Sequence, residues 1–265
     1  AGLIARQAEW VDFSYDGNFG PTDWLLGNNQ LRAGAIGVHG QLVLEATGAR
    51  RVNLSLGDGP GADRLRVLDV SSETHVALRG GTDSVTVGDG AQAAPVDRRS
   101  LVDIGAALVL DGGAGLDTLF VDDTANTTPG TQGSIGAASL TGFAMSGEGR
   151  IGFTGFASLD VMLSNQEDDV TITDTAIATT LRTDASAAGR TDKVLVQNAT
   201  AGATIDVGAG ADTVTIQASI GLVTVIGGDG AGTDAIVFDA ANMTLASVDG
   251  TLTQDGNDGR VNRLG

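Results

Sequence analysis

A short pattern recurs along the chain: an alternating apolar segment, a glycine-rich turn, an aspartate, and a second alternating apolar segment. Its clearest copy, IDVGAGADTVTI, runs from Ile205 to Ile216. In every copy, apolar residues stand two and four positions after the aspartate, which is in turn Asp63, Asp83, Asp117, Asp168, Asp192, Asp212 and Asp234. A period of two places both apolar side chains on one face of a β-strand. The chain is therefore expected to be all-β.

The spacing of these aspartates favours stacked strands. Successive members are 20, 34, 51, 24, 20 and 22 residues apart, and the intervals of 20 to 24 residues suit one coil of a solenoid. We expect a parallel β-helix (β-solenoid) of about 20–24 residues per coil, right-handed like other parallel crossovers, with all seven corners in one stack. A β-sandwich is the main alternative because it also uses short alternating strands, but it does not require a turn pattern at constant offset.

The same pattern predicts the organisation of the chain. Residues 1–48 precede the first clear repeat and are expected to form an N-terminal cap or docking segment. Residues 49–265 are expected to be the repeat region, with insertions near 92–100 and 124–158 where the spacing lengthens.

Composition restricts the function. Fifteen Lys and Arg against 33 Asp and Glu give a formal net charge of −18, which disfavours nucleic acid and anionic lipid as partners. Without cysteine there is no disulfide framework or thiolate metal site. No apolar run approaches the roughly 18–20 residues of a membrane span. Because the chain begins without Met and ends abruptly, it is expected to be a mature product or a section of a longer protein.

One stretch resembles a known family. GGAGLDTLF, residues 112–120, matches the repeats-in-toxin nonapeptide GGxGxDxUx, and residues 110–198 resemble a module of very large bacterial surface proteins of the haemolysin-type calcium-binding or adhesin-like kind. The resemblance covers about a third of the chain and departs at 164–168, where SNQED replaces the glycine turn. It implies a β-solenoid on the bacterial cell surface or outside the cell, and bound calcium.

Calcium requires roughly six to eight oxygen ligands, more than one turn provides. Sites between stacked turns would draw on the corner carboxylates, and the candidate ligands are Asp58, Asp63, Asp83, Asp111, Asp117, Asp212, Asp229 and Asp234. The alternative needs no metal: each aspartate accepts backbone N–H bonds within its own turn. The sequence leaves both interpretations open.

Aromatic side chains concentrate near the N-terminus. Five of the ten aromatic residues fall within fifteen positions and are candidate contacts for a ligand or partner: Trp10, Phe13, Tyr15, Phe19 and Trp24. Aromatic residues with interleaved Asp and Asn suit stacking on sugar rings, or burial against another protein. The alternative is a cap that seals the end of the solenoid. Phe143, Phe153 and Phe156 are expected to pack inside the fold.

No catalytic motif surrounds His39 or His75, and both are interpreted as structural. The chain is expected not to be an enzyme. The favoured function is a structural module of a large extracellular protein (stalk, surface layer or filament) whose partners are neighbouring modules or copies of itself end to end. The alternatives are an adhesin or module that binds extracellular glycan through the aromatic segment, and a β-helical polysaccharide lyase with Arg64 or Arg66 near Asp63.

Overall fold

The structure is a computed structural model that describes residues 2–6, 10–14, 22–27, 30–35, 42–47, 49–57, 61–88, 100–183, 190–228, 232–239 and 260–263. Every regular element in these ranges is a β-strand, which confirms the all-β prediction. No helix with the length and apolar character of a membrane span occurs among them. The chain divides into two compact units, Ala1–Asn126 with Ala138–Val161 (unit 1) and Thr127–Ala137 with Met162–Gly265 (unit 2).

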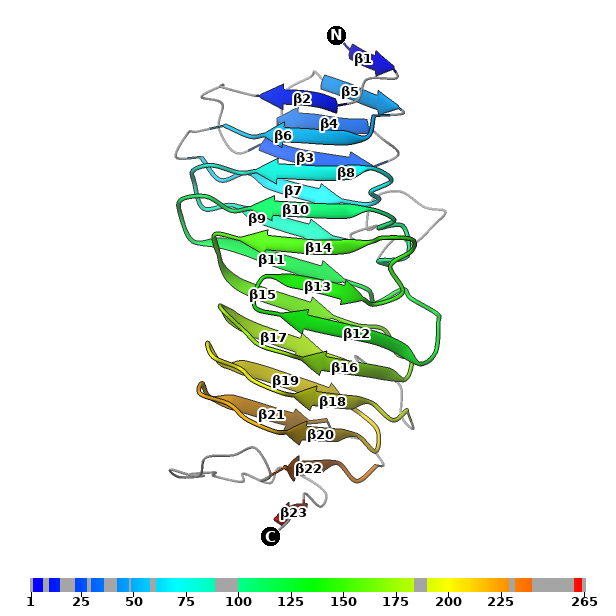
Figure 1. The fold of residues 1–265 in the computed structure, drawn as a ribbon, viewed down its shortest axis with the longest axis vertical. Helices are drawn as coiled ribbons and strands as arrows, with labels where there is room; N and C mark the ends of the chain where they lie inside the picture. Colours follow the sequence, from blue (N-terminus) through cyan, green and yellow to red (C-terminus); the bar gives the residue numbers. More distant parts are fainter. Residues whose placement is uncertain are drawn as a thin grey trace. The chain divides into compact units, whose positions relative to one another are not determined.

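Unit 1 contains parts of two mostly parallel sheets (Figure 1). The first has the spatial order β1 (Gly2–Arg6), β5 (Leu42–Thr47), β4 (Gln30–Ala35), β3 (Thr22–Gly27), β7 (Arg64–Val67), β9 (Ser84–Val87), β11 (Asp117–Asp122) and β15 (Phe156–Met162). The second has the order β2 (Trp10–Ser14), β6 (Arg51–Ser55), β8 (Glu73–Ala77), β10 (Ala107–Asp111), β14 (Arg150–Thr154) and β13 (Ser139–Gly142). The antiparallel pairs are β3 with β4, β4 with β5, and β13 with β14.

From β6 to β11 the chain alternates between these two sheets. In Figure 1 the arrows of β6, β8 and β10 point to the left and those of β7, β9 and β11 to the right. Equivalent residues pair in register, so that Leu65 lies beside Val85 and Val85 beside Leu119. All three side chains are buried. The residues two and four positions after Asp63, Asp83 and Asp117 therefore form continuous buried columns, as the alternation predicts.

Unit 2 repeats this arrangement. One group of parallel strands consists of β17 (Ala178–Arg182), β19 (Ala203–Gly208) and β21 (Val223–Gly227), and the other of β12 (Thr131–Gly136), β16 (Asp168–Ile172), β18 (Lys193–Val196), β20 (Thr213–Ile216), β22 (Ala235–Phe238) and β23 (Arg260–Arg263). Val170, Val194 and Val214 pair in sequence across β16, β18 and β20, and all three are buried.

The corners form two stacks and not the single stack expected from the sequence. Strands after Asp63, Asp83 and Asp117 pair with one another in unit 1, and strands after the other four aspartates pair in unit 2. The first stack ends at β15, which follows β11 in its sheet and begins with Phe156, Ala157 and Ser158 and without an aspartate.

The segment 124–158, expected to be an insertion, contains β12, β13, β14 and the start of β15, and β12 and β14 pair in parallel with β16 and β10. Residues 92–99 of the other expected insertion lie outside the described residues. The division at residue 48 stays a prediction. Phe143, Phe153 and Phe156 are buried, as expected.

Candidate functional site

The corner aspartates of unit 1 bond from repeat to repeat. Asp83 Oδ1 accepts a hydrogen bond from the backbone N–H of Asp63 at 2.7 Å, and Asp117 Oδ1 accepts one from the N–H of Asp83 at 2.6 Å. Each carboxylate thus reaches the equivalent residue of the preceding repeat and not its own turn. A side chain with one methylene suits this geometry, because neighbouring parallel strands lie only about 4.8 Å apart.

Unit 2 has the same connection. The backbone N–H of Asp168 donates to Asp192 Oδ1 at 2.8 Å, that of Asp192 to Asp212 Oδ1 at 2.7 Å, and that of Asp212 to Asp234 Oδ1 at 3.1 Å. Thr183 Oγ1 also donates to Asp192 Oδ2 at 2.7 Å. We call these two series, Asp63–Asp83–Asp117 and Asp168–Asp192–Asp212–Asp234, the carboxylate ladders. They satisfy buried corner N–H groups at the place where strand pairing begins.

A glycine that stands two positions before a corner aspartate allows the same close contact between repeats. A Cβ at Gly81 would lie 2.3 Å from the carbonyl oxygen of Gly61, and one at Gly115 would lie 1.7 Å from that of Gly81. In unit 2 the corresponding distances are 2.1 Å from Gly210 to the oxygen of Arg190 and 1.4 Å from Gly232 to that of Gly210. The carbonyl of one repeat therefore occupies the space of a side chain in the next, which explains the Gly-x-Asp spacing without a ligand.

Calcium binding at the corners is one of the two interpretations that the sequence leaves open. Among the described residues, no group of three or more acidic or histidine side chains is arranged to hold a metal ion. Asp111, at the exposed end of β10, accepts a bond from the N–H of Gly113 at 3.1 Å, and the ladder Oδ1 atoms accept backbone N–H groups. At these corners the Oδ1 atoms are therefore already used by backbone N–H groups, and calcium binding there stays a prediction. Asp58 and Asp229 lie outside the described residues, so the prediction stays open for the corners that contain them.

The second carboxylate oxygens of two ladder residues in unit 1 are buried. Asp83 and Asp117 are 1% and 0% exposed, and the Oδ2 atom of each is buried without a hydrogen-bond partner. Burial is the largest influence on Asp83 and raises its pKa to about 6, with the carboxyls of Asp117 and Asp63 acting in the same direction. The corner of unit 1 is thus a buried acidic site.

A second buried carboxyl fixes a loop of unit 1. Asp123 Oδ1 accepts the N–H of Leu101 at 2.8 Å, and its Oδ2 accepts Asn126 Nδ2 at 2.9 Å. Burial raises the pKa of Asp123 to about 6 in spite of these bonds. Sequence reasoning did not single out this residue, because a doublet of aspartates after a strand carries no signal of its burial.

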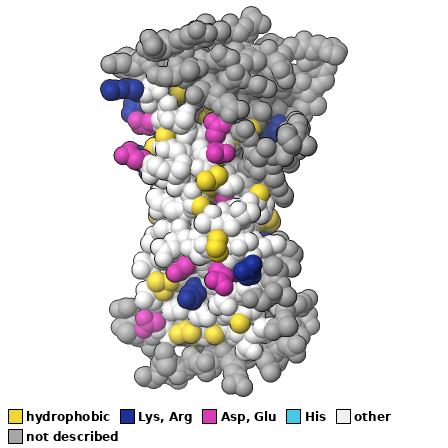
Figure 2. Space-filling view, turned by 90° about the vertical axis from the view of Figure 1, so that its right-hand side faces the viewer, with side chains coloured by type: hydrophobic (Ala, Val, Ile, Leu, Met, Phe, Trp, Pro, Cys, Tyr) yellow, Lys and Arg dark blue, Asp and Glu magenta, His cyan; other side chains and the backbone are white. Residues whose placement is uncertain are grey.

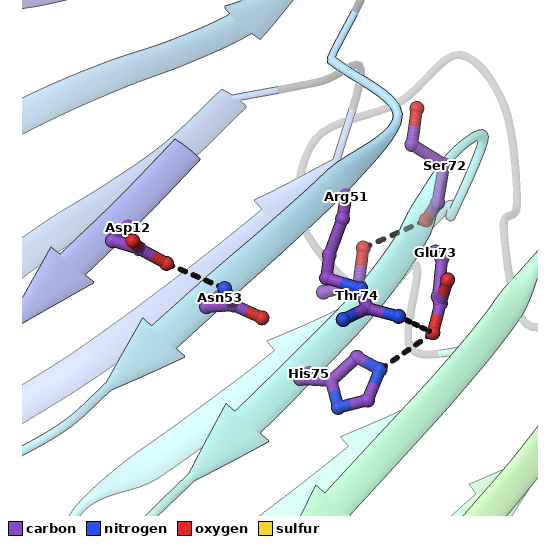
Figure 3. Close-up of polar contacts among 7 residues, drawn as sticks. All are labelled: Asp12, Arg51, Asn53, Ser72, Glu73, Thr74 and His75. Carbon is purple, nitrogen blue, oxygen red and sulfur yellow. Dashed lines mark hydrogen bonds and ion pairs between the residues drawn. The ribbon is translucent and has the colours of Figure 1, made fainter. Parts of the chain in front are cut away.

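A polar cluster lies on the outer face of β6 and β8 (Figure 3). Glu73 Oε1 accepts bonds from Arg51 and from His75 Nε2, both at 2.8 Å, and these side chains are partly exposed. The bond from His75, followed by that from Arg51, holds the pKa of Glu73 below its usual value. Asn53, which lies on β6 like Arg51, donates a hydrogen bond to Asp12 of β2. We call these five residues the outer polar cluster, and they show that His75 has a structural partner.

The predicted aromatic contact region is described only in part. Trp10 and Phe13 belong to β2 and Trp24 to β3, and for these residues the structure describes the backbone alone. Tyr15, Phe19 and His39 lie outside the described residues. The backbone of Trp10 pairs with Arg51, and that of Asp12 with Asn53, so β2, which carries Asp12 of the outer polar cluster, also carries Trp10 next to Arg51 of that cluster. A contact role for the aromatic side chains stays a prediction.

Comparison with known proteins finds no matching family model, no similar curated protein and no similar solved structure.

Proposed function

We propose that this chain is a right-handed parallel β-helix that serves as a structural module of a large extracellular bacterial surface protein. The observation that supports this proposal is the in-register parallel pairing of successive repeats, joined at each corner by a carboxylate ladder. Each repeat presents to the next the same buried column and the same corner N–H. A stack of this kind extends by adding repeats, as a stalk or filament requires.

The energetics of one repeat agree with such a role. A hydrogen bond to a charged group is worth about 1.5–3 kcal/mol, and a fully buried Val or Leu side chain contributes about 1.5–3 kcal/mol. Both recur along unit 1 and along unit 2, so stability accumulates with the number of repeats without disulfides. On the face drawn in Figure 2, acidic and basic side chains are interspersed among uncharged groups in the described part.

The proposal predicts concentration-dependent end-to-end association, because strands at the ends of a β-helix offer unpaired backbone groups to another copy. Analytical ultracentrifugation with electron microscopy over a hundredfold concentration range measures this association directly. Linear end-to-end particles are the expected result. A monomer at every concentration, combined with product release from uronic-acid polymers, would instead favour the lyase.

Calcium stabilisation belongs to the proposal for the corners that contain Asp58 and Asp229. We expect millimolar Ca²⁺ to raise the melting temperature beyond Mg²⁺ or Na⁺ at equal ionic strength, and Asp229→Asn to reduce that difference. Asp103→Asn, at an exposed aspartate of unit 1, is the matched control. Equal shifts in the three salts would leave only general screening of the net negative charge.

The second candidate function is glycan binding. It is favoured by the pairing of β2, which carries Trp10, with β6, which carries Arg51 and Asn53 of the outer polar cluster. A polar strand face beside an aromatic residue suits sugar hydroxyls and ring faces. We expect a glycan array to show retention that Trp10→Ala removes and Leu116→Ala leaves unchanged, since Leu116 is an exposed residue of unit 1.

A further inference from the structure

The last strand of one group in unit 2, β21, has an open and apolar side. Among the described strands it pairs with β19 alone. The column that runs through Leu181 and Ile205 is fully buried up to β19, but Val225, the next member, is only half-buried. The large apolar side chains beside it are exposed by 83%, 79% and 44%, at Ile220, Leu222 and Ile226 respectively. We call residues 220–227 the β21 edge.

The β21 edge is held in place by the preceding repeat. The N–H of Gly221 donates to the carbonyl oxygen of Ala199 at 3.0 Å, and the N–H of Ala203 donates to that of Leu222 at 2.9 Å. The exposed Ile220 and Leu222 therefore belong to a turn whose backbone is fixed on both sides of Gly221. A partner that binds there meets a surface that is already ordered, which lowers the entropic cost of association.

The β21 edge also lacks the features that protect terminal strands. Charged side chains and Pro usually prevent such a strand from pairing with another chain. Between Thr213 and Gly228 the sequence contains neither, although the whole chain has a net charge of −18. Because the carbonyl oxygen of Leu222 is bonded to β19, the backbone N–H and C=O groups of Val223 and Val225 face the open side of the strand.

We propose that the β21 edge binds β1 of a second copy of this chain, which pairs with it as an additional parallel strand. This inference rests on the proposed structural function and names the surface through which copies join. β1 is the first strand in the order of unit 1 and pairs in parallel with β5, its one described neighbour, so it also has an open side. Its sequence, GLIAR, is apolar up to Arg6. Backbone hydrogen bonds would supply affinity, and apolar contacts would supply selectivity.

Charge favours β1 over a second β21 edge as the occupant. Residues 229–239, which follow β21, carry three Asp and no basic residue. Two β21 edges in contact would bring two such acidic segments together, and like charges at an interface oppose association. β1 instead brings Arg6 and no acidic residue. A contact between two different surfaces also repeats from copy to copy as an open filament, whereas contact through one shared surface closes as a dimer.

The first measurement is disulfide formation between whole chains that each carry one introduced cysteine, because the chain has none of its own. Thr224→Cys is mixed in turn with Leu3→Cys, Ile4→Cys and Ala5→Cys, and intermolecular disulfides are quantified by mass spectrometry. Thr224→Cys alone reports contact between two β21 edges. Thr180→Cys is the matched control, because Thr180 lies in the same register column on β17, two strands from the edge.

The second measurement is sedimentation of Thr224→Lys, with Thr180→Lys as its control and circular dichroism as the check of folding. Thr224 is exposed, so a lysine there leaves the buried column intact. It places a charge on the terminal strand, opposite a β1 that already carries Arg6. We expect Thr224→Lys to weaken self-association by at least about tenfold, and Thr180→Lys to associate like wild type.

We expect Thr224→Cys to form disulfides with at least one cysteine of β1, and Thr180→Cys to form few. Association that is equally strong in Thr224→Lys and wild type would overturn the proposal and leave the proposed structural function intact. So would disulfides that Thr224→Cys forms with itself faster than with β1, because the copies would then join through two β21 edges. A wild type that stays monomeric at every concentration would contradict both proposals.

Discussion

Replacement of Gly210 by alanine tests the stacking of one repeat on the next by sterics alone. Gly210 has an ordinary backbone φ, so a side chain introduces no conformational strain there, but its Cβ would lie 2.1 Å from the carbonyl oxygen of Arg190. To lengthen the distance from this Cβ to the carbonyl oxygen to 3.0 Å, the strands would have to separate by roughly 1 Å. Their usual spacing of about 4.8 Å does not allow this separation without loss of hydrogen bonds.

The bonds at risk are the N–H of Ala211 to the oxygen of Arg190 at 3.2 Å and the N–H of Asp192 to Asp212 Oδ1 at 2.7 Å. Overpacking costs about 1–3 kcal/mol, the lost backbone bond adds about 1 kcal/mol, and the lost bond to the Asp212 carboxyl adds about 1.5–3 kcal/mol. Gly210→Ala is therefore expected to lower the free energy of unfolding by about 3–7 kcal/mol, measured by urea denaturation at pH 7.

Gly130→Ala is the matched control in the same unit. Gly130 has a φ of +69°, but a Cβ there meets no atom within 4 Å, so alanine introduces only the left-handed backbone penalty of about 1–2 kcal/mol. The stacking account predicts that Gly210→Ala costs clearly more than Gly130→Ala. An equal or smaller cost at Gly210 would show that the repeats are not packed with this carbonyl against this glycine.

Two further predictions concern unit 1. Leu119 is 1% exposed and Leu116 is 71% exposed, so Leu119→Ala should cost about 2–5 kcal/mol and Leu116→Ala less than about 0.5 kcal/mol in urea unfolding; similar costs would contradict the register of β11. Glu73→Gln should remove stability that is present above pH 4.5 and lost as pH falls through the lowered pKa of Glu73, because His75 and Arg51 favour its ionised form. Melting curves from pH 3 to 7 should show wild type and Glu73→Gln converging at the acidic end and in high salt, and a constant difference would contradict this reasoning.

The strands after the corner aspartates were predictable because a period of two is visible in single residues. Leu65, Val85 and Leu119 occupy equivalent positions in three repeats, and the structure pairs them in register. The pattern did not show that the corners separate into two groups, since that depends on β15 beginning without an aspartate. It also left open how a corner carboxylate is used, because a bond within one turn and a bond to the preceding repeat require the same residue.

The calcium interpretation stays a prediction for a related reason. GGAGLDTLF contains the glycines and aspartate of a calcium-binding nonapeptide, but close backbone stacking also requires glycine two positions before Asp117. The contacts of Thr183 with Asp192 and of Asn126 with Asp123 join side chains whose proximity depends on loop geometry. No periodic signal in the sequence indicates such contacts.

Disulfide formation between introduced cysteines can report whether successive repeats stack in parallel and in register, because the chain has no native cysteine. Thr204 and Thr224 are paired residues of β19 and β21, so Thr204→Cys with Thr224→Cys places the two Cα atoms about 4.8 Å apart, within disulfide range. In the control, Ile226→Cys replaces the second change and increases the separation to about 8 Å. We expect rapid oxidation of the first pair and little of the second. Equal oxidation of both pairs, or faster oxidation of the displaced pair, would show that β19 and β21 are not paired in this register.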